Sequence, residues 1–246
     1  MSVLNGLYSI IRQLWSISVS NEGYIKYLRR HGITVGDNVL FRNPAHTGID
    51  FTRPDLIEFG NNLDINDYFT VLTHDFGTFV FRECFNDFVN SSGKVIIGNN
   101  IVFGYNVTIL KGVTIGDNCI IGAGTVITRD IPANSVVVGA PARVICTIED
   151  YYKKRKSEQV KEALEYAKVL IDKRGKERVS IEDFTEEWVL FLTEGAYLSN
   201  PIVRHNVDIR LKGFIDSHDF FSREKIFKSF DDYINAACNY NNLTNE

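Results

Sequence analysis

Apolar residues recur at every sixth position along the middle of the chain. One column holds isoleucine or phenylalanine throughout, at Ile97, Phe103, Ile109, Ile115, Ile121 and Ile127. A second column, four residues further on, is apolar except for one threonine and consists of Ile101, Val107, Val113, Cys119, Thr125 and Ile131. Neither an α-helix nor a flat strand has a period of six. The pattern predicts a parallel β-helix, in which three hexapeptides form a triangular coil of about eighteen residues and both columns point inward.

The same period extends upstream from Val35. The companion column there is apolar throughout, at Val39, Ala45, Phe51, Ile57, Leu63 and Phe69. The other column is interrupted by the polar residues Thr47 and Arg53. We therefore expect the β-helix to begin near residue 33 and to hold these apolar side chains inside its first coils.

The period breaks between Val71 and Ile97, which are separated by twenty-six residues rather than a multiple of six. A segment must therefore leave the coil and return to it. His74 lies at the start of this segment, and residues 75–92 contain five phenylalanines. We expect this excursion to cover an acceptor or to pack on a neighbouring subunit.

Helical spacing flanks the repeats. An apolar stripe within residues 4–15 predicts a first helix, which would pack on the β-helix or a second subunit, or else lie on a membrane surface. A second helix is expected from Ser20, as N-cap, to Gly32, where it would cover the open end of the first coil. Together these helices form a predicted N-terminal cap over residues 1–32, followed by the β-helix over residues 33–146.

Beyond residue 146 the composition changes to Glu, Lys, Tyr and Ala, which predicts an α-helical extension over residues 147–246. A long helix is expected from Ile148 to Lys173. A second should run from Ser180, in a capping-box-like arrangement, to about Gly195. A third is expected to begin near Ser222. The fold class is therefore mainly β, with helical segments at both ends.

Composition excludes several classes of protein. The chain has 246 residues, 44% of them apolar, and a net charge of −4, which gives no electrostatic reason to expect nucleic acid. The four cysteines show no paired spacing, and Cys119 is expected to be a small buried apolar residue. No apolar run is long enough to span a bilayer, and no signal peptide is apparent. We expect a cytoplasmic location.

The run from Gly98 to Ile145, GNNIVFGYNVTILKGVTIGDNCIIGAGTVITRDIPANSVVVGAPARVI, resembles the signature of the hexapeptide-repeat acyltransferases. The segment VLTHDFG, which contains His74, is similar to the catalytic segment of their O-acetyltransferase branch, which includes sugar, galactoside and maltose acetyltransferases. The resemblance covers roughly residues 30–146. It implies a left-handed β-helix, a homotrimer and acetyl-CoA as acyl donor.

The chemistry of this family requires a base that accepts a proton from the attacking hydroxyl. Histidine suits this near neutral pH, and by resemblance His74 matches the catalytic histidine. A carboxylate beside it would fix its tautomer, and Asp75 is the adjacent candidate. Asn66 and Asp67 lie one hexapeptide earlier, where similar enzymes place groups that bind the acceptor; the sequence leaves open which of these side chains orients the imidazole.

The resemblance also assigns a donor site. It places Tyr105 near the thioester, where its backbone N–H would stabilise the oxyanion, and places Ala123, Thr128 and Arg129 along the coenzyme arm. Arg143 matches a basic position near the nucleotide phosphates. The chain departs from related sugar acetyltransferases at Val102 and Tyr105, where those enzymes often carry tryptophan and serine.

Three functions remain open from the sequence. The favoured one is an acetyl-CoA-dependent O-acetyltransferase that acts on a sugar or glycan hydroxyl by direct transfer, with no metal. The second is a zinc enzyme similar to the γ-carbonic anhydrases, for which the repeats offer only His46 and His74, without a ligand motif. The third is a non-catalytic β-helix scaffold.

Overall fold

The computed structural model describes residues 20–211 and 217–240. The chain forms two compact units, divided between Tyr152 and Lys153. The predicted helix within residues 4–15 lies outside the described residues. No helix in the described ranges is long and apolar enough to cross a membrane.

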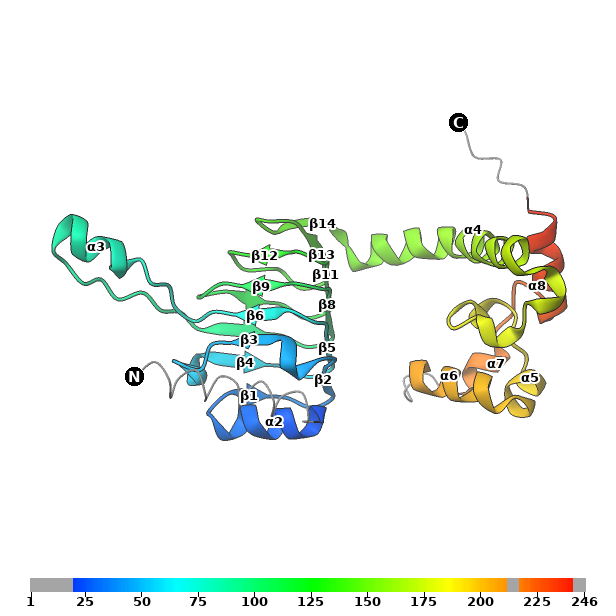
Figure 1. Cartoon of the computed structure of the whole chain (residues 1–246), viewed down its shortest axis with the longest axis horizontal. Coiled ribbons are helices and arrows are strands. Elements are labelled where there is room, and N and C mark those ends of the chain that lie inside the picture. Colours follow the sequence, from blue (N-terminus) through cyan, green and yellow to red (C-terminus); the bar gives the residue numbers. More distant parts are fainter. Residues whose placement is uncertain (1–19, 212–216, 241–246) are drawn as a thin grey trace, which may run out of the picture. The chain divides into compact units, whose positions relative to one another are not determined.

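The first unit is a coil of short strands that form three sheets (Figure 1). Sheet A contains, in order, β1 (Thr34–Val35), β4 (Ile57–Phe59), β7 (Val95–Ile97) and β10 (Thr114–Ile115). Sheet B contains β2 (Val39–Phe41), β5 (Leu63–Ile65), β8 (Ile101–Phe103), β11 (Cys119–Ile121), β13 (Ser135–Val138) and β14 (Arg143–Thr147). Sheet C contains β3 (Thr47–Ile49), β6 (Phe69–Val71), β9 (Thr108–Ile109) and β12 (Val126–Ile127).

Successive strands pass from sheet A to sheet B to sheet C, so three strands complete one coil. The strand pairs are parallel, except that β14 returns antiparallel to β13. This topology is a parallel β-helix and fits the left-handed form. We call the turn from sheet B into sheet C the B–C corner, and the turn from sheet C into sheet A the C–A corner.

The core of the coil consists of the predicted inward columns. Every residue of the two columns between Ile97 and Ile131 is buried, including Thr125, whose hydroxyl donates to the carbonyl of Gly122 at 2.7 Å. Cys119 is also buried, as expected. Removal of these large aliphatic side chains from water supplies the main stabilisation of the fold. The sequence prediction of the repeat is confirmed here.

The upstream prediction is wrong at two positions. Ala45 and Phe51 are only half-buried, and Ile49 occupies the interior instead. Two 3-10 turns, η1 (Pro44–His46) and η2 (Pro54–Leu56), enlarge this coil, so that Thr34 pairs with Glu58, twenty-four residues on. Twenty-four is a multiple of six, and the apolar columns therefore regain their phase at Ile57.

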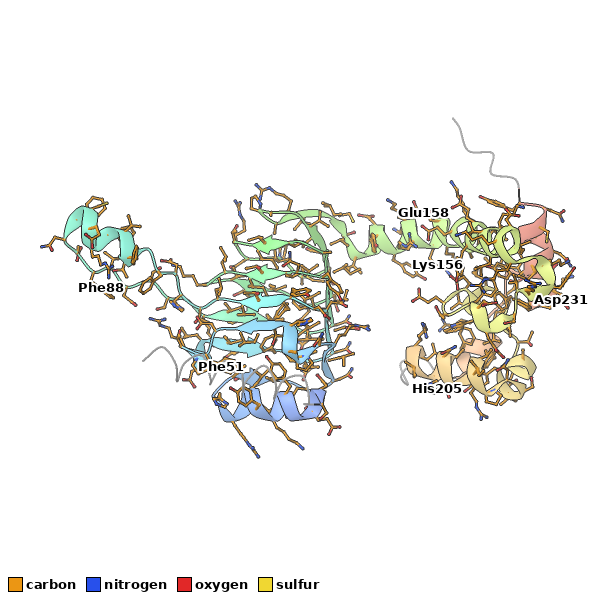
Figure 2. All side chains as sticks on the ribbon, in the orientation of Figure 1. Phe51, Phe88, Lys156, Glu158, His205 and Asp231 are labelled. Atoms are coloured by element: carbon orange, nitrogen blue, oxygen red, sulfur yellow. The ribbon has the colours of Figure 1, made fainter. Side chains whose placement is uncertain are left out.

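The segment between β6 and β7 leaves the coil as the interrupted period predicts (Figure 1). It carries α3 (Thr78–Phe85) and exposes its aromatic side chains, including Phe88, which is 73% exposed (Figure 2). At its root, His74 and Ser92 form an antiparallel bridge. The two ends of the excursion are thus held together where it joins the C–A corner.

Asparagines in the left-handed conformation line the turn from sheet A into sheet B. They are Asn38, Asn62, Asn100, Asn118 and Asn134, with φ between 53° and 60°. Each amide donates to the carbonyl oxygen of the next across 2.7–3.0 Å. We call this row the asparagine ladder. Asparagine tolerates the left-handed conformation better than other non-glycine residues, and its side chain pairs with its equivalent in the next coil.

The first coil is covered by α2 (Asn21–Arg30) (Figure 1). Ser20 is its N-cap, as expected, and accepts a hydrogen bond from the backbone N–H of Gly23 at 3.2 Å. Gly32, at φ 95°, follows the helix. Tyr24 and Leu28 are buried against the coil. The predicted second helix of the N-terminal cap is confirmed.

The second unit is helical. Its helices are α4 (Ile148–Arg174), which begins in the first unit, and α5 (Glu194–Ser199), α6 (Pro201–Leu211), α7 (Ser217–Ser222) and α8 (Phe230–Cys238), with the 3-10 turns η3 (Lys176–Arg178), η4 (Ile181–Asp183) and η5 (Glu187–Leu190). The buried hydroxyl of Tyr233 donates to the carbonyl of Ala163 at 2.6 Å and ties α8 to α4. The long helix from Ile148 is confirmed.

Two helix predictions in this unit are wrong. The capping box of Ser180 and Asp183 is present, but it opens only η4, and α5 starts anew from its own N-cap at Thr193. The apolar residues after Ser180 have helix-like spacing because aromatic side chains such as Phe184, Trp188 and Phe191 are buried in the core of the second unit, although the backbone between them forms only short 3-10 turns. Ser222 ends α7 rather than starting a helix. The next helix, α8, begins after its own N-cap at Ser229.

Candidate active site

His74 lies at the C–A corner, three residues after the end of β6. Its Nδ1 is 2.6 Å from Oδ2 of Asp50, which occupies the same corner one coil earlier, directly after β3. The His74 side chain is 28% exposed, whereas the Asp50 side chain is 4% exposed. The pair therefore consists of an accessible imidazole that rests on a buried carboxylate.

Threonines surround the Asp50 carboxylate. Oδ2 accepts from the hydroxyl of Thr73 at 2.6 Å and from its backbone N–H at 3.1 Å. Oδ1 accepts from the hydroxyl of Thr52 at 2.7 Å and from its backbone N–H at 2.9 Å. Burial raises the pKa of Asp50, but the hydrogen bonds from Thr52, Thr73 and His74 outweigh it and hold the pKa well below its ordinary value.

The charge of Asp50 determines the tautomer of His74. An ionised carboxylate only accepts hydrogen bonds, so Nδ1 of His74 must carry the proton that it shares with Asp50. Nε2 of the neutral ring then has a free lone pair. This is the arrangement in which a histidine can take a proton from a substrate and pass it on, with the charge of the resulting imidazolium stabilised by the carboxylate.

Asp75 lies next to His74 but has other partners. Its Oδ2 accepts from the hydroxyl of Ser91 at 2.6 Å and is 2.9 Å from Nζ of Lys111, and its Oδ1 accepts from the backbone N–H of Gly77 at 3.0 Å. The hydrogen bond from Ser91 and the contact with Lys111 lower the pKa of Asp75. This carboxylate fastens the root of the excursion to the neighbouring coil, and a part in catalysis stays a prediction.

Four of the other predicted residues lie at the B–C corner. Asp67, Tyr105 and Ala123 form one row across three coils, because each stands three residues before the paired residues Thr70, Thr108 and Val126. Asn66 precedes Asp67, and its side-chain amide donates to the carbonyl of Phe103 at 2.9 Å. Its predicted role at the acceptor remains a prediction.

Asp67 is the hydrogen-bonding centre of this corner. Its Oδ2 accepts from Nδ2 of Asn43 at 2.9 Å and lies 2.9 Å from Nδ1 of His46. The hydrogen bond with His46 lowers the pKa of Asp67 despite some burial. The charge of Asp67 in turn raises the pKa of Tyr105. The favoured acetyltransferase prediction gave no role to His46, which the structure places in contact with Asp67.

The remaining donor-site residues are exposed. Thr128 and Arg129 follow β12 and so lie at the C–A corner, on the same side of the coil as His74. Arg143 begins β14, and its guanidinium donates to the carbonyl of Ala142 at 2.9 Å. The predicted site residues therefore divide between two corners of the chain.

The sequence prediction did not include Asp50, Thr52 or Thr73. A signal for Asp50 was present, because an aspartate directly after an apolar strand occupies the same corner as His74. The 3-10 turns of this coil obscured that correspondence. Among the described residues, no group of three or more His, Cys, Asp and Glu side chains is arranged to hold a metal ion.

Comparison with known proteins identifies relatives of this chain. The family described as hexapeptide repeat of succinyl-transferase matches residues 94–129. The putative acetyltransferase YvoF of Bacillus subtilis is 34% identical over 140 residues, which cover 57% of this chain and 73% of that protein. The protein CapG of Staphylococcus aureus is 36% identical over 124 residues, 50% of this chain and 71% of that protein.

Two further matches are more limited. The galactoside O-acetyltransferase of Escherichia coli is 54% identical over 59 residues, only 24% of this chain and 29% of that enzyme. The crystal structure of a maltose O-acetyltransferase from Clostridium difficile is 27% identical, covers 57% of this chain and 84% of that one, and has a TM-score of 0.39. The resemblance seen in the sequence is confirmed, and the chain belongs to the hexapeptide-repeat acetyltransferases, a family of acyltransferase enzymes.

Proposed function

We propose that this protein transfers an acetyl group from acetyl-CoA to a hydroxyl of a sugar or glycan precursor. The observation that carries the proposal is the contact of 2.6 Å between Nδ1 of His74 and the buried Asp50. The names of related sugar acetyltransferases support the acceptor class, and a related structure described as a galactoside acetyltransferase in complex with coenzyme A supports the donor.

The proposed mechanism is direct transfer. Nε2 of His74 takes the proton of the acceptor hydroxyl as its oxygen attacks the thioester carbonyl. The C–S bond then breaks, and the leaving sulfur takes the proton from the imidazolium. The buried Cys119 belongs to the core of the coil, so it does not serve as a nucleophile for an acyl-enzyme.

The two corners require more than one copy of the chain. One side of the triangle separates Asp67 from His74, and its extended residues span roughly 15–20 Å. A single reaction centre therefore cannot contain both corners of one chain. A homotrimer of left-handed β-helices would place the C–A corner of one copy against the B–C corner of the next. The backbone N–H of Tyr105 and the side chain of Ala123 would then face His74 of the neighbouring copy along the coenzyme arm.

His74→Ala tests the catalytic role. Loss of the general base should lower the rate of transfer by about 10²–10⁴-fold. The affinity for acetyl-CoA, measured by isothermal titration calorimetry, should change little, because the proposed donor contacts do not involve the imidazole. Transfer is followed as release of the coenzyme thiol with a panel of sugars and sugar nucleotides.

The matched control is His205→Ala, which removes an exposed histidine of α6 in the second unit (Figure 2). This variant should retain the wild-type rate. Equal rates for His74→Ala and the wild-type protein would overturn the role of His74. A wild-type protein that binds no acetyl-CoA would favour the scaffold, and stoichiometric zinc in the purified protein would favour the zinc enzyme similar to the γ-carbonic anhydrases.

A further inference from the structure

Tyr68 adopts a backbone conformation that is unusual for its side chain. Its φ is 61°, in the left-handed region, where bulky residues are uncommon. The residues at the same position of the next two coils are Asn106 at φ 57° and Gly124 at φ 71°. These two residue types adopt this conformation readily. An aromatic residue in their place indicates that the ring itself is needed.

The ring of Tyr68 belongs to an aromatic group that crosses three coils. The imidazole of His46 stacks on it, with ring centroids 4.8 Å apart and planes within 10°. The ring of Tyr105 lies next to it on the other side of the row, at 6.1 Å and 53°. Despite these contacts, Tyr68 is 53% exposed and Tyr105 is 51% exposed. We call His46, Tyr68 and Tyr105 the aromatic platform.

Polar side chains next to the aromatic platform hold its rings in position. The Asp67 side chain, 15% exposed, accepts from Asn43 and pairs with His46, which fixes the imidazole under Tyr68. The same carboxylate lies beside Tyr105 and raises the pKa of its hydroxyl. The platform is thus an exposed surface of aromatic rings, with His46 held by Asp67 and with hydroxyl and carboxylate groups beside the rings.

We propose that the aromatic platform binds the pyranose ring of the acceptor. A pyranose presents a face of C–H groups, which matches the electron-rich face of an aromatic ring, and carries hydroxyls at its rim, which match the polar edge. This inference rests on the proposed function. Because the platform lies at the B–C corner, it serves the His74 of a neighbouring copy.

Tyr68→Asn gives a sharp test, because the variant carries the residue that the next coil has at this position. Loss of the ring should raise the KM for the sugar acceptor about ten-fold, the upper range for one aromatic contact. The KM for acetyl-CoA should stay within about two-fold, because the ring of Tyr68 is not among the proposed donor contacts. The melting temperature should stay the same or rise, since asparagine relieves the backbone. Tyr68→Phe keeps the ring and should retain the KM of the wild-type protein.

Tyr152→Asn is the matched control, since it removes a tyrosine ring that is 61% exposed from α4 and leaves the platform intact. It should leave the KM for the sugar unchanged. An unchanged KM for Tyr68→Asn would overturn the proposal. Dissociation of the Tyr68→Asn variant into smaller species in analytical ultracentrifugation would also overturn it, because the ring would then serve the contact between copies.

Saturation-transfer difference NMR separates this proposal from the proposed function. Methyl β-D-galactopyranoside, methyl α-D-glucopyranoside and N-acetylglucosamine are each titrated into the full-length protein with free coenzyme A present. Binding of one sugar that is lost in Tyr68→Asn supports the platform, even if the wild-type protein transfers no acetyl group. The absence of binding by all three, together with an unchanged KM in the variant for any active acceptor, rejects it.

Discussion

Asp50 contributes to stability as well as to the orientation of His74. Its pKa is lower in the folded protein than the ordinary value of about 3.9 expected in the unfolded chain. The folded state therefore favours the ionised form. The resulting stabilisation is fully present above about pH 5 and is lost as the pH falls through the unfolded pKa toward the lower folded pKa.

We expect the free energy of unfolding of the wild-type protein to fall between pH 5 and pH 3, roughly the range in which the unfolded carboxyl takes up its proton. Asp50→Asn should be less stable at pH 7, because its amide cannot accept all the hydrogen bonds of Thr52 and Thr73. Its stability should depend less on pH across this range. Urea unfolding at pH 7, 5, 4 and 3 measures both.

Other carboxylates, including Asp75 and Asp183, also have lowered pKa values and contribute to acid unfolding in both proteins. Only the difference between wild type and variant therefore reports on Asp50. A gap in stability that stays constant from pH 7 to pH 3 would contradict the assignment.

The asparagine ladder shows how a repeating element selects its residues. Asn100 has φ 57°, donates to Asn118 at 2.8 Å and accepts from Asn62 at 3.0 Å. Asn100→Gly keeps the conformation and loses both hydrogen bonds, which should cost about 1 kcal/mol because the site is exposed. Asn100→Ala loses the hydrogen bonds and also strains the backbone, for a total of about 2–3 kcal/mol. Urea unfolding measures the difference.

Asn86→Gly is the control for the ladder. Asn86 has φ 51° at the end of α3 and lies outside the row of equivalent asparagines. This variant should change the free energy of unfolding by only a few tenths of a kcal/mol. Equal losses for Asn100→Gly and Asn100→Ala would show that the conformation does not select asparagine at this turn.

The repeat explains which parts of the structure the sequence could predict. Between Ile97 and Ile131 each side of the coil has six residues, so the register of every inward residue follows from counting. In the coil that contains Asp50, the 3-10 turns lengthen the coil from eighteen to twenty-four residues. Because twenty-four is also a multiple of six, the apolar columns are back in phase at Ile57, and the sequence pattern does not show that this coil is longer. Counting then points to Phe51 where Ile49 is buried, and the correspondence between Asp50 and His74 is lost.

The six-residue period also does not predict which side chains form hydrogen bonds with one another. His74 was found because the period fails beside it, but its partner lies twenty-four residues earlier in the sequence. The adjacent Asp75 was a reasonable candidate, yet its carboxylate is held by Ser91 and Lys111. In the helical unit no period constrains the elements, so single caps such as Thr193 and Ser229 decide where the helices begin.

At the scale of the whole molecule, the predicted site residues lie at two separate corners of the coil. We therefore predict that each reaction centre forms between two copies of the chain in a trimer. His74→Ala removes the base at the C–A corner, and Ala123→Trp should block the coenzyme arm at the B–C corner. Each variant alone should be inactive. If each centre combines the two corners of neighbouring copies, trimers reassembled from an equal mixture should have about a quarter of the wild-type activity, because that fraction of centres receives both intact corners.

Mixing His74→Ala with Asp50→Asn provides the control. Both changes lie at the C–A corner, so every centre in a mixed trimer carries one of them, and activity should stay at the level of the impaired variants. Complementation is measured as thiol release after co-refolding or co-expression, with the oligomeric state followed by ultracentrifugation. Recovery in the first mixture but not in the second would require the centre to lie between copies. No recovery in either mixture, from variants that form mixed trimers, would show that the two corners do not combine in one centre and would contradict the proposed assembly.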